Sequence, residues 1–446
     1  MKRNHCILLL LLLLTPACFA QKVRFSLLFP PMKTGDPYWN DVNTYVLPSP
    51  LITDVTVAMK WSDIETSQGV YNFNTFDAQL THFYAAGKKV NIVTQPISPS
   101  GINKFTPDYI FTPEWAASLG VPQLDVITCS SFAGNGTANS GMPVPYEVPF
   151  KQGLKNFFIQ LINHYKNNAN IGYIRLGLAI GGDFYPRCST VMPGFSAQVW
   201  TDYAAEMNAF EASLQPGMQL MQSVCQISSA NDGNADIEAE NAVKNGISIG
   251  VQGWEISDNT SKTCTSDWCA LFEKYSGKIS PLELQTLAAS DPTGVSQTGS
   301  LVDLIPFAVT HKAQILELYT IDWLLALDPN YSSLNGASAA FVPYASAYLK
   351  TISDASVASR LESVNADLQG NYISLNPSTD YLDIHTPFVG FKNVQIYNST
   401  GQLVLDKEFM ENTISIDASH FAPGFYAVNV TEIDSKKFCS MKYIQR

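Results

Sequence analysis

The sequence predicts an α/β protein, a (β/α)8 barrel followed by a small C-terminal β-sandwich, and two observations carry this prediction. From residue 22 to about residue 355, short apolar β-branched runs alternate with stretches of helical periodicity, as in parallel strands joined by helices. Past about residue 370, polar and apolar residues alternate between turn signals instead. A chain of 446 residues, 46% of them hydrophobic, has room for one large domain and one smaller domain.

Eight strands are predicted in the first part of the chain, and helices are readable between them. The predicted strands are Val23–Phe29, Asp54–Lys60, Lys89–Thr94, Tyr173–Ile180, Met218–Val224, Ile247–Gln252, Leu282–Leu287 and Gln314–Tyr319. The clearest helices are Phe76–Ala86, Phe150–Lys166, Ala197–Leu214 and Ala235–Asn245. Eight such units in about 330 residues match a (β/α)8 barrel with enlarged loops. An open doubly wound sheet is the alternative, but no G-x-G-x-x-G follows the first strand.

The N-terminal residues 1–20, "MKRNHCILLLLLLLTPACFA", predict a secretory signal peptide. Lys2 and Arg3 precede an apolar run over Ile7–Leu14, and small residues precede Gln21. A lipoprotein signal through Cys18 is the alternative. Elsewhere no stretch approaches the roughly 18 uninterrupted apolar residues of a membrane span, so we expect no transmembrane segment.

Charge and cysteine content fit an exported protein. Loss of the two basic residues of the leader takes the formal charge from −12 to −14, and such a surface repels nucleic acid and anionic lipid. Export permits disulfides among the six remaining cysteines. Cys264 and Cys269 are the first expected pair, and Cys129 with Cys188 is the second. The cysteines are scattered and no histidine lies near the first pair, so no metal site is expected.

The tail carries four segments that occur in order. They are "NPSTDYLDI" (376–384), "VQIYNSTGQLV" (394–404), "APGFYAVNV" (422–430) and "KKFCSMKYIQR" (436–446). Together they resemble the C-terminal sorting domain of cargo for the type IX secretion system of Bacteroidetes-like bacteria. The resemblance implies that residues 370–446 are read by an outer-membrane translocon and that the protein is secreted or held at the outer cell surface. An accessory immunoglobulin-like sandwich is the alternative. The barrel domain is then expected at residues 21–365.

The second predicted strand runs into "KWSDIETSQGVYNFNTFDAQL" (60–80), and "AAGKKVNIVTQP" (85–96) continues it. This stretch resembles the "W-x-x-I-E, G-x-Y-x-F" element of (β/α)8 glycoside hydrolases related to β-galactosidases and xylanases. The resemblance implies that Trp61 helps to floor a sugar site. Packing at the barrel rim is the alternative role for this side chain.

Working residues of such barrels come from the carboxyl ends of the strands and the loops that follow. The fourth strand leads into "GYIRLGLAIGGDFYP" (172–186), which resembles the strand that delivers the general acid in these hydrolases, usually a glutamate. Here the acid is Asp183, one methylene shorter. Two glycines before it allow close backbone approach, and Phe184 and Tyr185 after it can desolvate the carboxyl group and raise its pKa. A helix cap or a pair with Arg187 is the alternative.

Strand eight, in "AQILELYTIDWLLALDP", places a carboxylate inside an apolar run. Alternation puts Ile315, Glu317 and Tyr319 on one face, so Glu317 is expected to point into the barrel. A carboxylate there needs a partner or a function. We predict Glu317 as the second catalytic carboxylate, with a salt bridge to Arg175 or Lys60 as the alternative.

Strands six and seven offer further candidates. Glu283 and Gln285 share one face of strand seven, whose end carries the nucleophile in related hydrolases. Glu283 sits early in that strand, so Gln285 is expected nearer the mouth. Strand six ends in "GVQGWEISD", which offers Gln252, Trp254 and Glu255 as a sugar-binding rim. Glu255 is a third acid candidate or an ordinary loop residue.

These residue types predict hydrolysis of a glycosidic bond by two carboxyl groups, which lie about 5 Å apart for retention and about 6.5–9.5 Å apart for inversion. Aromatic rings would meet the apolar faces of the sugars, and we expect Trp61, Tyr185, Trp254, Tyr319 and Trp323 in that role. Acids, amides and aromatics together favour a neutral polysaccharide. The alternative is a non-catalytic carbohydrate-binding barrel, because an aspartate replaces the usual glutamate. No G-x-S-x-G, H-E-x-x-H or P-loop occurs, and no cofactor is implied.

Overall fold

The structure is a computed structural model, and it describes residues 23–33, 35–99, 101–132, 140–214, 217–224, 234–255, 267–290, 298–327, 344–367, 372–376, 381–385, 390–398, 402–411, 413–422, 424–433 and 438–445. The chain divides into a larger unit, Val23–Ser356, and a second unit that holds the tail from Val357 onward. Helix α12 (Ala345–Asp367) runs through this division. The expected signal peptide lies outside the described residues.

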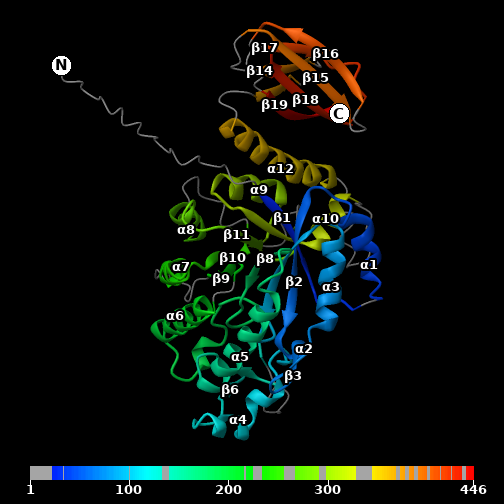
Figure 1. The fold of residues 1–446 in the computed structure, drawn as a ribbon. Coiled ribbons are helices and arrows are strands. Elements are labelled where there is room, and N and C mark those ends of the chain that lie inside the picture. The colour runs from blue at the N-terminus through cyan, green and yellow to red at the C-terminus, as the bar shows by residue number, and fades with distance from the viewer. Residues whose placement is uncertain are drawn as a thin grey trace, which may run out of the picture. The chain divides into compact units, whose positions relative to one another are not determined.

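Eight parallel strands close into a barrel, as the sequence predicts (Figure 1). Around the barrel the order is β1-β12-β11-β10-β9-β8-β5-β2. The strands are β1 (Arg24–Phe29), β2 (Ile52–Lys60), β5 (Lys89–Gln95), β8 (Ile171–Arg175), β9 (Leu220–Ser223), β10 (Ser248–Trp254), β11 (Glu283–Thr286) and β12 (Ile315–Tyr319). Neighbours in sequence are neighbours in space, and β12 pairs with β1 to complete the ring.

Helices between the strands cover the outside of the barrel (Figure 1). They include α3 (Asn74–Ala85), α5 (Val148–Tyr165), α6 (Ala197–Ser213), α7 (Asn234–Lys244), α8 (Asp267–Tyr275), α9 (Leu301–Thr310) and α10 (Thr320–Leu327). Shorter elements are α1 (Tyr38–Asp41), η1 (Val42–Val46), α2 (Trp61–Ile64), η2 (Asp108–Phe111), α4 (Pro113–Ser118) and η3 (Ser189–Val191). Local sequence fixes several starts: Ser196 caps α6 by accepting from the Val199 amide, and Ser300 caps α9.

Strand four is shorter than predicted, because β8 ends at Arg175 and not at Ile180. Beyond Arg175 the chain stays beside β5 without strand pairing: the Gly177 amide donates to Thr94 Oγ1 at 2.7 Å. A single bridge joins Ile97 and Ile180. The apolar composition of this buried segment predicts a strand, but its partners are the Thr94 hydroxyl, the Met221 carbonyl and one isolated bridge, which do not form a continuous ladder. Asp183 therefore belongs to a loop and not to the strand end.

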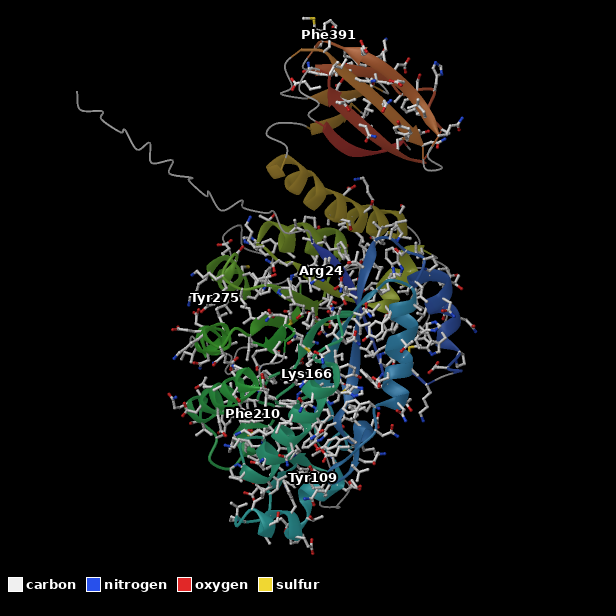
Figure 2. All side chains as sticks on the ribbon, in the orientation of Figure 1. Arg24, Tyr109, Lys166, Phe210, Tyr275 and Phe391 are labelled. Carbon is white, nitrogen blue, oxygen red and sulfur yellow. A yellow bond between two sulfur atoms is a disulfide. The ribbon has the colours of Figure 1, made fainter. Side chains whose placement is uncertain are left out.

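Buried polar side chains from several strands lie in the barrel, and Figure 2 shows side chains throughout this unit. Near the middle of the barrel, Ser26 Oγ lies 2.8 Å from Thr56 Oγ1, and the Asn91 amide reaches both hydroxyls at 3.5 Å. Tyr173, Met221 and Ile315 form a small apolar cluster of their own. Since Tyr173 and Ile315 each precede a charged residue on the same strand face, this cluster lies next to the charged groups described below.

A long insertion separates β5 from α5 and is tied to the loop after β8. It contains η2, α4 and the short pair β6 (Val126–Ile127) and β7 (Met142–Pro143). A disulfide joins Cys129 of this insertion to Cys188, which confirms the second of the two expected pairs. Cys269 is disulfide-bonded as well, and Cys264, its expected partner, lies outside the described residues.

The tail consists of two antiparallel sheets, which confirms the predicted sandwich-like domain. One sheet has the order β13-β14-β17, from Tyr372–Asn376, Tyr381–His385 and Thr413–Asp417. The other has the order β16-β15-β18-β19, from Leu403–Phe409, Lys392–Asn398, Gly424–Glu432 and Phe438–Gln445. Alternate residues of both sheets share one core, which includes Leu382, Ile384, Val394, Ile414 and Val428. A short pair, β3 (Glu65–Ser67) and β4 (Val70–Tyr71), belongs to the barrel unit.

Across the described residues, no helix has both the length and the apolar content that crossing a bilayer requires.

Candidate active site

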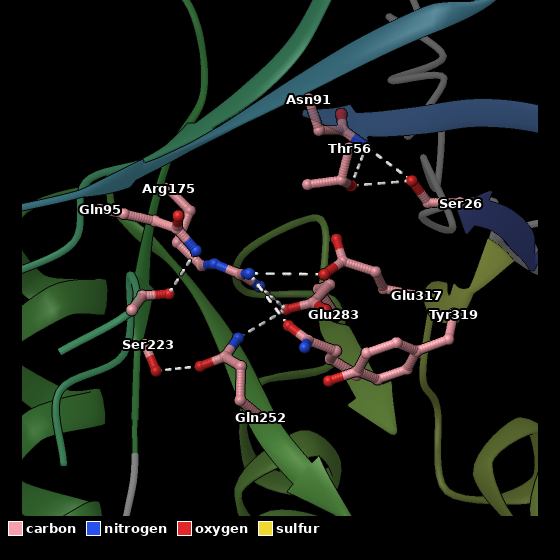
Figure 3. Close-up of polar contacts among 12 residues, drawn as sticks. Ser26, Thr56, Asn91, Gln95, Arg175, Ser223, Gln252, Glu283, Glu317 and Tyr319 are labelled. Atoms are coloured by element: carbon pink, nitrogen blue, oxygen red, sulfur yellow. Dashed lines mark hydrogen bonds and ion pairs between the residues drawn. The ribbon is translucent and has the colours of Figure 1, made fainter. Parts of the chain in front are cut away.

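Arg175 is the centre of a buried charge cluster at the carboxyl end of β8 (Figure 3). Its Nη1 donates to Glu283 Oε2 at 3.1 Å, and its Nη2 reaches Glu317 Oε1 at 3.4 Å. Nη2 also donates to Gln285 Oε1 at 3.0 Å. Alternation on β11 and β12 therefore directs these side chains into the barrel, as the sequence predicts. The salt bridge between Glu317 and Arg175, given as the alternative role for Glu317, is present.

Amide and hydroxyl groups extend the cluster on both sides. Gln252 of β10 donates from Nε2 to Glu283 Oε2 at 3.2 Å, and Ser223 of β9 donates to Gln252 Oε1 (Figure 3). On the other side the Tyr173 hydroxyl donates to Glu317 Oε2 at 3.4 Å. Five consecutive strands of the barrel, β8 to β12, thus contribute to one connected polar network.

Burial sets the electrostatics of this network. Glu283 has no exposed surface, and burial raises its pKa to about 8, with the negative charge of Glu317 adding to the increase and Arg175 opposing it. Burial opposes the charge of Arg175 as well, but the two carboxylates outweigh it and raise the pKa of the guanidinium. Burial and the carboxylates likewise raise the pKa of Tyr173 well above its ordinary value. The cluster therefore contains more acids than its single arginine can neutralise.

Asp183 lies on the loop after β8, half-buried, and the glycines before it explain its position. The Asp183 amide donates to the Ile180 carbonyl at 2.7 Å, and Gly181 donates to the Ile97 carbonyl at 2.9 Å. Gly182 has φ +88°, and a Cβ on it would lie 2.5 Å from Val93 Cγ2 and 3.0 Å from the Thr94 carbonyl oxygen. Only glycine fits between this loop and β5, so the tight approach fixes where Asp183 emerges.

The Asp183 carboxyl group responds to the charges of the same cluster. Burial raises its pKa to about 6; Glu317 adds to this increase, while Arg175 and Arg187 oppose it. No ion pair between Asp183 and Arg187 forms among the described residues; Arg187 instead lies over the Tyr185 ring, 6.0 Å from its centre. Asp183 is thus an acid of intermediate strength, and its carboxyl group is influenced by the negative charge of Glu317.

The rim residues predicted from sequence divide into two groups. Gln285 and Gln252 lie in the network, Tyr319 is partly buried with its hydroxyl 3.4 Å from the Leu287 carbonyl, and Tyr185 is 49% exposed. Glu255 follows the end of β10 and is partly buried. These residues stand at the carboxyl ends of strands, where a ligand could reach them.

Three tryptophans predicted to contact sugar are fully packed against protein instead. Trp61 has no exposed surface and is stacked on Phe157, with ring centres 5.8 Å apart. Trp254 packs edge-on against Trp268, and Trp323 is 1% exposed and donates from Nε1 to the Tyr45 carbonyl at 2.8 Å. The structure does not bring these three rings to the charge cluster.

The motif that begins at Trp61 has a structural explanation. Trp61 Nε1 donates to Glu65 Oε2 at 2.7 Å, and the amide of Gly69 donates to Glu65 Oε1 at 2.9 Å. The buried Glu65 carboxylate therefore joins α2 to the hairpin of β3 and β4. The tryptophan, the acid and the glycine of the motif are spaced to build this corner of the barrel.

Two features of the site were not predicted. Ser223 and Tyr173 complete the network, and only the inward face of a predicted strand could have pointed to them. Asp322 of α10 is buried and accepts from the Ser290 amide and hydroxyl at 2.8 and 2.6 Å, which links the loop after β11 to the helix after β12. Burial raises the pKa of Asp322 to about 7, with the Ser290 hydrogen bonds opposing this. Within the described residues, no group of three or more histidine, cysteine or acidic side chains is arranged to hold a metal.

Comparison with protein families explains the second unit. Residues 376–443 match the family described as "Secretion system C-terminal sorting domain". The tail is a secretion sorting domain. It indicates export through the type IX secretion system to the cell surface or beyond, as the four tail segments predict. No curated protein matches the sequence of the chain.

Solved structures similar to the chain include a mannanase, a beta-galactosidase and a xylanase. An endo-beta-1,4-mannanase from Thermotoga petrophila is 11% identical, with a TM-score of 0.45 over 95% of this chain and 97% of that one. A beta-galactosidase from the psychrophilic Marinomonas ef1 is 9% identical, with a TM-score of 0.46 over 77% and 60%. Xylanase 10B from Thermotoga petrophila is 10% identical, with a TM-score of 0.41 over 72% and 86%. The barrel assignment itself rests on the strand order and pairing given above.

Proposed function

We propose that the barrel hydrolyses glycosidic bonds in an extracellular neutral polysaccharide. The observation that carries this proposal is the convergence of Asp183, Glu283 and Glu317 around Arg175, which lies at the carboxyl end of strand four. Glycosidic hydrolysis uses one carboxyl group that gives a proton to the leaving oxygen and another that acts as base or nucleophile. The export signal in the tail agrees with a substrate outside the cell.

Asp183 is the proposed general acid. A pKa of about 6 leaves part of the Asp183 population protonated near neutral pH, while the group remains a strong enough acid to transfer its proton. Glu317 is the proposed second carboxylate, and Glu283 is its competitor for that role. The amides of Gln252 and Gln285 and the hydroxyl of Tyr319 are the proposed hydrogen-bonding partners for sugar hydroxyls. The exposed Tyr185 is the proposed stacking surface, and Glu255 lies at the same rim.

A carbohydrate-binding barrel without catalysis is the second candidate. Glu317 and Glu283 are fully buried and engaged with Arg175, and Asp183 is one methylene shorter than the glutamate usual in hydrolases with this motif. In this case the same rim binds sugar, and the carboxyl groups contribute to stability and orientation. The three tryptophans packed inside the protein contribute to binding in neither candidate.

A glycan-library assay separates the candidates. The wild type is tested for release of reducing ends beside Asp183→Asn, Glu317→Gln and the control Arg24→Gln, which removes the ion pair with Asp54 at the amino end of the barrel. We expect wild type and Arg24→Gln to hydrolyse the same glycans and the two site variants to lose about 10²–10⁴-fold in rate. Glycan binding by every protein without turnover supports the second candidate. Neither binding nor turnover contradicts both.

A further inference from the structure

The charge cluster contains two buried glutamates beside one arginine, and their hydrogen bonds differ. We infer that Glu283 holds a proton and is a positioning residue that fixes Arg175 and Gln252, while Glu317 carries the negative charge that pairs with Arg175. This inference rests on the proposed function only where it makes Glu283 a positioning residue and Glu317 the second carboxylate of the reaction. The place of the proton is a property of the folded barrel and is testable without a substrate.

Glu317 has the surroundings of a carboxylate. Each of its oxygens faces a donor. Oε1 lies 3.4 Å from Arg175 Nη2 (Figure 3), and Oε2 lies 3.4 Å from the Tyr173 hydroxyl. Negative charge spread over two oxygens is stabilised best when both accept hydrogen bonds. Since Glu317 has no exposed surface, these two donors replace the water that an ionised carboxyl group requires.

Glu283 has the surroundings of a neutral acid. Both of its donors, Arg175 Nη1 at 3.1 Å and Gln252 Nε2 at 3.2 Å, reach the same oxygen, Oε2. Oε1 is buried and has no hydrogen-bond partner among the described residues. An ionised carboxylate oxygen in that position would carry about half of a negative charge with no donor to stabilise it. A protonated oxygen is neutral, so its burial costs much less solvation free energy. The proton therefore belongs on Oε1 of Glu283.

In the part of the chain that the structure describes, the groups facing Arg175 supply no second positive charge to balance an ionised Glu283. Arg175 is the cation of the cluster, and the other groups that face it are Tyr173, Tyr319, the neutral amides Gln252 and Gln285, and the acid Asp183. Burial and the charge of Glu317 together raise the pKa of Glu283 to about 8. One positive charge thus pairs with one negative charge, and Glu283 stays neutral near neutral pH.

The backbone holds Glu283 deeper than Glu317. Glu283 pairs in register with Gly250 and Ile315, whereas Glu317 stands opposite Gln285, one inward residue nearer the mouth. A Cβ on Gly250 would lie 2.3 Å from Glu283 Oε2, so the missing side chain of Gly250 makes room for the carboxyl group. From this lower position Glu283 supports Arg175 and Gln252, which in turn face the proposed substrate.

Infrared difference spectra locate the proton. A protonated carboxyl group gives a carbonyl band that a carboxylate lacks, so each glutamate is compared with its glutamine variant near neutral pH. We expect Glu283→Gln to remove one protonated-carboxyl band. Glu317→Gln also takes away the negative charge beside Glu283 and should release its proton, so variants of the two donors identify the group. Gln252→Leu removes a donor to Glu283 Oε2 and should shift the band, whereas Tyr173→Phe removes the donor to Glu317 Oε2 and should leave it in place. Glu211→Gln is the positive control, because Glu211 is fully buried and neither of its oxygens has a hydrogen-bond partner within the described ranges, so its band should also disappear. A band that shifts in Tyr173→Phe and not in Gln252→Leu would overturn the inference.

Kinetics then test the roles. Glutamine has the shape of a protonated glutamate, so Glu283→Gln should keep kcat/KM within about tenfold of the wild type, while Glu317→Gln loses about 10²–10⁴-fold. Equal losses in both variants would contradict the positioning role. If the wild type hydrolyses nothing, the proposed function fails, and the infrared result alone decides where the proton resides.

Discussion

Replacing Gly182 with alanine puts a methyl group where the loop before Asp183 touches β5. Two costs follow from the structure: φ is +88°, which costs a residue with a Cβ about 1–2 kcal/mol, and the Cβ would lie 2.5 Å from Val93 Cγ2, an overpacking worth about 1–3 kcal/mol. The lower entropy of the unfolded alanine chain offsets about 0.4–1 kcal/mol. We therefore expect Gly182→Ala to lower the free energy of unfolding by about 2–4 kcal/mol.

Gly194→Ala is the matched control. Gly194 also has a positive φ, +67°, but no atom lies within 4 Å of a Cβ placed there. Only the conformational cost remains, so the expected loss is about 1 kcal/mol or less. The difference between the two variants isolates the steric contact with β5.

Urea denaturation followed by tryptophan fluorescence measures this difference. All seven tryptophans lie within Val23–Ser356, so the signal reports on the barrel unit alone. Because the displaced loop carries Asp183, Gly182→Ala should also lower glycan hydrolysis at temperatures where the variant is folded. Equal stability of Gly182→Ala and Gly194→Ala, within about 0.5 kcal/mol, would refute the steric argument.

Three further predictions concern stability. Burial raises the pKa of Glu211 well above its ordinary 4.5, so folding holds a proton that unfolding releases, and stability is lost as pH rises above 4.5, by up to about 1.4 kcal/mol per pH unit; Glu211→Gln should remove this slope in urea titrations at several pH values. The disulfide between Cys129 and Cys188 spans 59 residues, so replacing both by serine should cost about 2–4 kcal/mol. Trp61→Phe removes the donor to Glu65 and should cost about 1–3 kcal/mol without weakening glycan binding, as calorimetry would show.

Each of these three has a contrary result that is easy to recognise. A Glu211→Gln protein with the same pH slope as the wild type would mean that Glu211 is ionised in the fold. Reductant should destabilise the wild type more than the double serine variant, and equal sensitivity would assign the effect to Cys269. Weaker glycan binding by Trp61→Phe at unchanged stability would return Trp61 to the sugar site.

Sequence periodicity was sufficient for the architecture of the barrel because its strands and helices bury one face each. It located seven of the eight strands within two residues at each end, and alternation placed Glu317 inside the barrel. The end of strand four could not be predicted, because the chain beyond Arg175 bonds to the Thr94 side chain, which is far away in sequence. Nothing local distinguishes such a partner from a neighbouring strand.

The site was predicted less completely than the fold, for a physical reason. A sequence shows that Glu283 and Glu317 face inward, but the distribution of their donors depends on Arg175, Gln252 and Tyr173, each from a different strand. The tryptophans were assigned to the site wrongly for a related reason. Aromatic rings near strand ends are typical of sugar sites, but the indole N–H groups of Trp61 and Trp323 donate to partners inside the protein. The sequence does not show whether the N–H group of a tryptophan is hydrogen-bonded inside the protein or is available to a ligand.

The corner that Glu65 builds with Trp61 and Gly69 bears on how likeness to a hydrolase should be weighed. These residues hold α2 and a hairpin together, and a barrel that lost its chemistry would still need them in order to fold. Selection for stability alone would therefore be enough to preserve these residues, whether or not the barrel is an enzyme. The loop around Asp183 is under the opposite constraint, since its glycines serve the placement of one carboxyl group. A related chain that kept Trp61, Glu65 and Gly69 but had other residues in the Asp183 loop would therefore be expected to bind sugar without hydrolysing it.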